Sequence, residues 1–128
     1  MATRSKAKAL ARAESKDRRP KAIAKYIRIS PSKVQIVLDL IRGKDYKEAV
    51  AILKTTAKAA SEPVLKCMNS AAANAEVNLG MNKDTLYVAE CFADQGPTLK
   101  RMQPVSRGRG YRILKRTSHI TVIMDERA

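Results

Sequence analysis

The stretch that decides the fold is residues 85–124, TLYVAECFADQGPTLKRMQPVSRGRGYRILKRTSHITVIM. Residues 85–93 and 119–124 are rich in β-branched and aromatic residues, which favour strands. Between them, residues 95–118 hold seven basic residues, no acidic residue, and several glycines and prolines that turn the chain. We expect one long β-hairpin whose distal half, about residues 95–118, leaves the body. Arms of about ten residues reach roughly 30 Å.

A two-stranded ribbon by itself is marginally stable in water, so a partner has to stabilise this one. Because the ribbon is basic and acid-free, that partner is expected to be RNA or DNA. The alternative is a loop without a fixed structure on the protein surface.

The charge of the whole chain supports a polyanionic partner. Residues 1–28 carry +8, residues 29–94 carry 0, residues 95–124 carry +7 and the last residues −1, for a net charge of +14. Basicity without a partner would be spread over the body as well. Segregated like charges repel each other unless a polyanion neutralises them.

The rest of the sequence predicts an α+β domain. Residues 22–29 alternate like a strand, with Ile23 and Ile27 on one side, and Ser30 and Pro31 suit a helix start. Further helices are expected from Asp45, in a capping box with Glu48, and from about Ser61 to Gly80. We predict a small three-stranded antiparallel sheet packed on three helices, with a long protruding basic β-hairpin. The domain spans residues 22–124, after a basic extension (1–21) that is disordered alone and before a short tail (125–128).

Catalytic, metal and cofactor sites are not expected. His119 is the single histidine, so neither a His pair nor a His-based metal cluster is possible. Cys67 and Cys91 lack zinc-ligand spacing and are predicted to be reduced and buried. The glycines at 108 and 110 lack the spacing of a phosphate-binding loop. With no Trp and one Phe, an aromatic platform for stacked bases is disfavoured.

No apolar run approaches the 18 residues of a membrane span, and the N-terminus lacks the apolar core of a secretory signal. An organellar transit peptide at residues 1–22 remains an alternative, although Glu14 and Asp17 disfavour it.

Several motifs resemble the bacterial type of the large-ribosomal-subunit protein twenty-two family. They are Tyr26–Val34 (YIRISPSKV), Asp39–Lys44 (DLIRGK), Asn74–Glu76 (NAE), Gly96–Arg101 (GPTLKR) and Arg112–Val122 (RILKRTSHITV). The resemblance covers about residues 22–124. It implies a cytoplasmic, ribosome-bound structural protein that binds several domains of the large-subunit rRNA and aids subunit assembly. It also implies neighbouring ribosomal proteins as partners, no membrane, no homo-oligomer, and a hairpin that lines the nascent-peptide exit tunnel.

On this basis we predict the RNA-binding residues. In the body and at the root of the hairpin, where it joins the body, they are Lys21, Lys25, Arg28, Ser30, Lys33, Arg42, Lys44, Thr117, Ser118 and His119. In the hairpin they are Lys100, Arg101, Arg107, Arg109, Arg112, Lys115 and Arg116. The predicted tunnel-lining tip is Leu99, Lys100, Arg101, Met102, Gln103, Pro104 and Val105.

Departures from the family pattern accompany this resemblance. Many members have basic residues where this chain has Ser32 and Gln35, and at the tip Pro104 is followed by Val105 and Ser106. Fewer phosphate contacts are therefore expected there. Two rival functions are a free architectural DNA-binding protein and an RNA-processing enzyme that uses His119.

Overall fold

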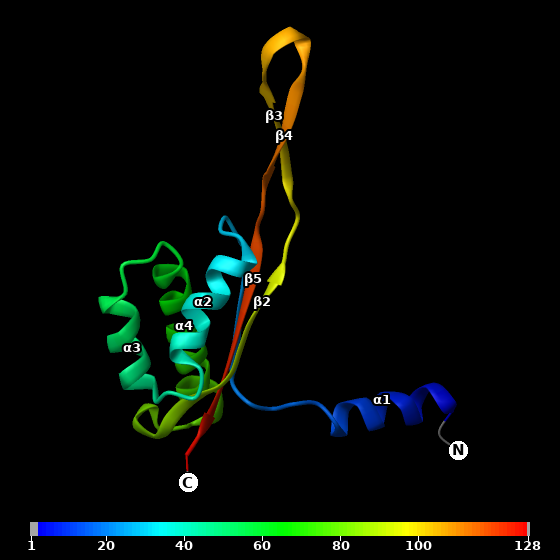
Figure 1. Ribbon diagram of the computed structural model, residues 1–128. Helices are drawn as coiled ribbons and strands as arrows, with labels where there is room; N and C mark the ends of the chain where they lie inside the picture. The colour runs from blue at the N-terminus through cyan, green and yellow to red at the C-terminus, as the bar shows by residue number, and fades with distance from the viewer. Residues whose placement is uncertain (1–2, 128) are drawn as a thin grey trace.

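The computed structural model describes residues 3–127, which form an α+β body with a long ribbon at one end (Figure 1). The strands β1 (Lys21–Ile27), β5 (Ser118–Glu126) and β2 (Leu86–Gln95) make an antiparallel sheet in the order β1-β5-β2. The helices α2 (Pro31–Ile41), α3 (Tyr46–Thr55) and α4 (Ser61–Leu79) lie on one side of it. The predicted three-stranded sheet on three helices is confirmed.

The core lies between the sheet and helices α2 and α4, while α3 packs on those helices from outside. Its larger members are Val34, Leu38, Ile41, Val64, Met68, Leu86, Val88, Ile120, Val122 and Met124. Helix α4 presents Ala71, Ala72 and Ala75 to the inside, all fully buried. Small side chains at these positions let the helix lie close to the strands. Cys67 and Cys91 are buried and unpaired, and burial raises the pKa of both thiols.

The alternation expected for the first strand is wrong after Ala24. The pairing of β1 with β5 shifts between Ala24 and Ile27, and Tyr26 has a φ of 58°. This bulge reverses which side chains face the helices. As a result Ile23 is half exposed on the open face of the sheet, whereas Ile27 packs against the core.

The helices begin where the sequence indicated, but without the expected caps. Neither Asp45 nor Ser30 makes a side-chain hydrogen bond to its helix. The Asp45 carboxylate pairs instead with Arg127, at 2.9 Å. Ser61 is the first residue of α4 rather than its cap, and its hydroxyl is buried without a partner. Hydrophobic packing therefore stabilises these helices more than their caps do.

The ribbon consists of β3 (Leu99–Pro104) and β4 (Gly110–Lys115), paired from Leu99↔Lys115 to Pro104↔Gly110. It continues the β2–β5 pair beyond the body (Figure 1). The end of the ribbon is the turn 105–109, where the backbone N–H of Val105 donates to the carbonyl of Arg109. Leu99–Pro104 were predicted to be the tip, but they form the strand that leads to it, because pairing continues through Pro104.

Both ends of the chain have more structure than the extension and short tail expected from the sequence. Within the extension, α1 (Arg4–Glu14) is a helix with no buried residue, so it is not a core-facing helix. Residues 1–2 and 128 lie outside the described part of the chain. At the other end, β5 continues to Glu126, and Arg127 lies over the ring of Tyr87, 4.9 Å from its centre. Asp125 and Glu126 thus extend the central strand of the sheet, and the backbone N–H of Arg127 donates to the carbonyl of Thr85, so these residues are not a free tail.

Candidate nucleic-acid interface

Basic residues of the body fall into two groups according to whether a carboxylate neutralises them. The paired ones are Arg42 with Asp39, Lys44 with Glu48, Lys47 with Asp84, Lys66 with Glu62 and Lys83 with Glu76. Lys33, Lys54 and Lys58 have no such partner among residues 3–127. Exposed ion pairs are weak, but each one still lowers the charge available to a phosphate.

Two predicted RNA contacts, Arg42 and Lys44, belong to the paired group. Arg42 also donates a hydrogen bond of 2.9 Å to the carbonyl of Cys91 on β2, so it joins α2 to the sheet. Its pKa is raised, mainly by the hydrogen bond to Asp39. The structure therefore gives Arg42 a structural role and leaves its contact with RNA a prediction.

Unpaired cations gather in a groove at the root of the hairpin. A cavity of about 430 Å³ lies between the β1–α2 connection, the α3–α4 loop and the end of β4. It is lined by Arg28, Ile29, Ser30, Lys33, Ala59, Leu114, Lys115 and Arg116. A smaller, mostly apolar cavity of about 240 Å³ adjoins it and adds Ile36, Lys58 and Ala60. We call the two together the root groove; it is lined by five cations and no carboxylate.

The fold brings these residues together from distant parts of the chain. The Arg28 guanidinium donates a 2.7 Å hydrogen bond to the carbonyl of Arg116, which ties the first connection to the hairpin. Lys33 projects from the first turn of α2, where the helix dipole adds positive potential. Five predicted RNA residues, four cations and Ser30, thus share one site. Ser30 is half-buried there, with its hydroxyl 3.3 Å from that of Ser32.

Lys58 is the RNA-contact candidate that sequence reasoning missed. It lies in the loop between α3 and α4, in a region with no net charge and no recognisable motif. The sequence contains no signal for it, because Glu62 lies four residues further on, and only the structure shows that Glu62 pairs with Lys66 instead. Only the packing of α3 and α4 carries it to the groove.

Three residues predicted to hydrogen-bond RNA at the root lie in different environments. The Thr117 hydroxyl is buried and donates to the carbonyl of Pro97. The Ser118 side chain is completely buried, and its hydroxyl has no partner. Thr117 therefore joins the two sides of the root, and neither hydroxyl is open to an outside partner in this conformation. His119 is partly exposed and keeps one ring nitrogen, Nε2, for an outside partner.

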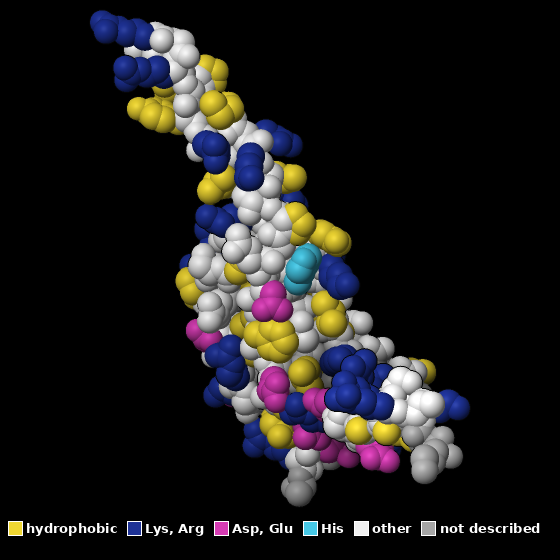
Figure 2. Space-filling view, turned by 90° about the vertical axis from the view of Figure 1, so that its right-hand side faces the viewer, with side chains coloured by type: hydrophobic (Ala, Val, Ile, Leu, Met, Phe, Trp, Pro, Cys, Tyr) yellow, Lys and Arg dark blue, Asp and Glu magenta, His cyan; other side chains and the backbone are white. Residues whose placement is uncertain are grey.

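The ribbon carries cations on both of its faces. Residues opposite each other in a strand pair project to the same face. The register pairs Leu99 with Lys115 and Arg101 with Ile113 on one face, and Lys100 with Leu114 and Met102 with Arg112 on the other. Figure 2 shows Lys and Arg side chains along the whole ribbon, with Asp and Glu confined to the body and the region below it. This ribbon is suited to being surrounded by a polyanion rather than to lying on one.

The remaining predicted residues are more scattered. Lys21 and Lys25 are exposed on β1, and Arg107 and Arg109 are exposed at the turn of the ribbon. Arg107 has a φ of 60° and Gly108 a φ of 70°, so the turn passes through two left-handed residues before Arg109, whose backbone is extended. The residues described here contain no group of three or more potential metal ligands. Within residues 3–127, no helix has the length and apolar character needed to cross a bilayer.

Comparison with known proteins agrees with this geometry. The model of the family described as ribosomal protein L22p/L17e matches residues 22–125. The chain is 57% identical over 108 residues to the large ribosomal subunit protein uL22 of Clostridium novyi, covering 84% of this chain and 97% of that protein. The uL22 proteins of Acetivibrio thermocellus (62% identical, covering 84% and 86%) and Clostridium acetobutylicum (59%, covering 84% and 96%) are similar over the same share of the chain.

Proposed function

This chain belongs to the ribosomal protein L22p/L17e family, and we propose from that premise how its surfaces serve the large ribosomal subunit. It is a structural protein of that subunit and not an enzyme. Binding of rRNA and a part in subunit assembly follow from the family and explain the charge of the chain. Since its relatives are bacterial, its place is the cytoplasm, on the ribosome.

The observation that carries the RNA-binding mode is the root groove together with the two-faced ribbon. Phosphates are the ligands for five unneutralised cations around a groove, and arginines can contact them in a bidentate way. The ribbon has cations on both faces and buries no residue of β3. We infer that the groove fixes the body on one rRNA segment while the ribbon passes between others. The protein thereby contacts several rRNA domains and holds them together.

The tunnel assignment is a further step of the same proposal. A ribbon of this kind, inserted among rRNA segments, can reach the path of the nascent peptide. Its strand β3 and the turn 105–109 then face the tunnel, with apolar Leu99, Met102 and Val105 between cations. Support comes from the exposure of these residues, since Leu99 is 41% and Met102 65% exposed. Neighbouring ribosomal proteins would adjoin the body.

The test of this function is association with large subunits through a high-salt wash. An inserted ribbon stays bound because the surrounding RNA would have to move before it leaves. A basic protein held at the surface is stripped, since counterions displace it. Recovery with the nucleoid instead of with large subunits would support the architectural DNA-binding alternative. For the tunnel, a photo-crosslinker at Met102 should capture a stalled nascent chain, and crosslinks to RNA alone would refute that part.

A further inference from the structure

The N-terminal extension contains a surface that the family relationship does not explain. The family match begins at residue 22, after the whole of α1. None of the eleven residues of this helix is buried, so packing within the protein does not account for it. In Figure 1 the helix runs outward from the end of the sheet that is opposite the ribbon.

The charges of α1 oppose helix formation in the free protein. Arg4, Lys8 and Arg12 follow at intervals of four and share one side, where like charges repel. The first turn has no acidic residue to favour the helix dipole, and it contains the cations Arg4 and Lys6. A helix of this length is marginal in water even without these penalties. An external anion running along the stripe from Arg4 to Arg12, about 12 Å at 1.5 Å per residue, would remove these penalties.

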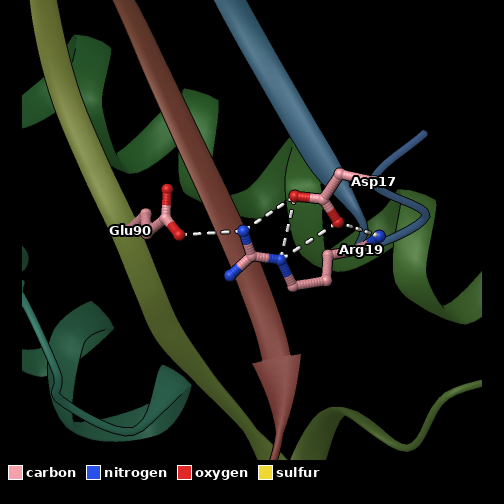
Figure 3. A network of polar contacts seen from close by, with 3 residues as sticks. All are labelled: Asp17, Arg19 and Glu90. Carbon is pink, nitrogen blue, oxygen red and sulfur yellow. Dashed lines mark hydrogen bonds and ion pairs between the residues drawn. The ribbon is translucent and has the colours of Figure 1, made fainter. Parts of the chain in front are cut away.

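A three-residue clamp fixes where the extension leaves the body (Figure 3). The Arg19 Nη2 atom lies 2.7 Å from the Asp17 carboxylate and 2.8 Å from that of Glu90 on β2. The backbone N–H of Arg19 also donates to Asp17, at 3.0 Å. The side-chain hydrogen bond from Arg19 is the main reason that the pKa of Asp17 is lowered to about 2. Pro20, next to the clamp, accepts a hydrogen bond from the backbone of Met124.

The clamp has an electrostatic consequence as well. Arg19 occupies both carboxylates, Asp17 and Glu90, that would otherwise attract the cations of α1 to the body. Beyond the clamp, residues 3–18 hold six cations against Glu14 and the already paired Asp17. The helix is therefore held at a fixed origin, away from the body, with its charge unneutralised.

We propose that residues 3–18 form a second RNA-binding arm, which takes the phosphate backbone of large-subunit rRNA at a place separate from the ribbon and the root groove. The choice of RNA rests on the proposed function. Charge complementarity selects a polyanion, and the four-residue spacing presents Arg4, Lys8 and Arg12 along one line. The protein thus binds rRNA at both ends of its body, through the arm at one end and through the ribbon and root groove at the other.

The experiment compares the full chain with an arm-neutral variant, Arg4→Gln/Lys8→Gln/Arg12→Gln. Glutamine retains helix propensity, so the change removes the charges with little effect on helix formation. The matched control, Arg4→Lys/Arg12→Lys, keeps the charge. Binding to protein-free large-subunit rRNA is measured at several salt concentrations. Loss of three phosphate contacts should make the slope of log affinity against log salt shallower by about two to three, while the control keeps the wild-type slope.

A second measurement identifies the partner in assembled subunits. A photo-crosslinker at Leu10, which is 60% exposed, should react with rRNA. An unchanged salt slope in the arm-neutral variant, or crosslinks to a protein only, would overturn the arm and leave the proposed function intact. Failure of the wild-type chain both to bind this rRNA and to enter subunits would overturn both.

Discussion

The Nδ1 atom of His119 accepts a hydrogen bond of 3.0 Å from the backbone N–H of Tyr26, across ninety-three residues of sequence. The two rings meet edge to face, with centres 5.0 Å apart. Tyr26 is the bulged residue of β1, in a left-handed conformation that is unfavourable for a tyrosine. His119 therefore stabilises the bulge that determines which side chains of β1 face the helices. An accepting Nδ1 requires the hydrogen of a neutral ring to be on Nε2, which can donate it to RNA.

We predict that His119→Phe lowers the free energy of unfolding by about 1 kcal/mol, because the Tyr26 N–H loses its partner. His119→Asn provides an oxygen acceptor on a shorter side chain and should lose less. Denaturant unfolding of the free protein measures both. Equal stability of the phenylalanine variant and the wild type would show that the bulge does not depend on this hydrogen bond.

Gly96→Ala should destabilise the root of the hairpin. A Cβ at this position would lie 2.5 Å from the Thr117 hydroxyl oxygen and 3.1 Å from the nearest atom of the His119 ring. Overpacking of this kind costs about 1–3 kcal/mol. Because Thr117 supplies the closest atom, Gly96→Ala/Thr117→Ala should lose less stability than the sum of the single variants. Strict additivity in this double-mutant cycle would contradict the clash.

The clamp at the origin of the arm should titrate at low pH. The folded-state pKa of Asp17 is about 2, below its value of about 3.9 in an unfolded chain. The ionised Asp17 therefore contributes fully to the stability of the folded protein above about pH 4, and this contribution disappears as the pH falls through 2. The carboxyl carbon signal of Asp17 in NMR should follow this curve. In Arg19→Gln the midpoint should rise toward the unfolded value, and an unmoved midpoint would exclude the clamp as the cause.

Neutralising the root groove should weaken RNA binding more than neutralising paired lysines. We predict that Lys33→Gln/Lys58→Gln makes the salt slope of binding to large-subunit rRNA shallower by about two. The control, Lys47→Gln/Lys66→Gln, removes the same charge from lysines paired with Asp84 and Glu62, and should change the slope less. Equal effects in the two variants would mean that total charge matters and the groove does not.

The body should fold without the ribbon. Leu99 and Lys115 form the first pair of the ribbon, so a two-residue Asn-Gly turn can replace residues 100–114 between them. No removed residue belongs to the core. The variant should retain cooperative unfolding with a similar midpoint. Loss of the transition would show that the ribbon contributes to the stability of the body.

The free protein should also lack a stable ribbon, as its charge and its two-stranded architecture indicate. That expectation concerns the protein without RNA, and amide hydrogen exchange over residues 100–112 measures it. Strong protection there without RNA would refute it.

Local patterns in the sequence determined the elements of the body and the class of its partner. Each of these patterns is visible from residues that are close in the sequence. They are the helical spacing of apolar residues in α2, the small residues of α4, and the β-forming residues at the two ends of the hairpin. The segregated charge and the acid-free ribbon likewise needed no tertiary structure to indicate a nucleic acid. The family motifs then identified the ribosome, which composition and spacing alone could not have done.

Tertiary structure decided what depends on residues far apart in the chain. The bulge at Tyr26 depends on pairing with β5 and on His119, so alternation wrongly placed Ile23 and Ile27 on the same face. Lys58 joins the groove only through the packing of α3 on α4. Arg19 meets Glu90 only because β1 and β2 flank β5 in the same sheet. In each case the energy comes from a contact between distant segments, which a local pattern does not contain.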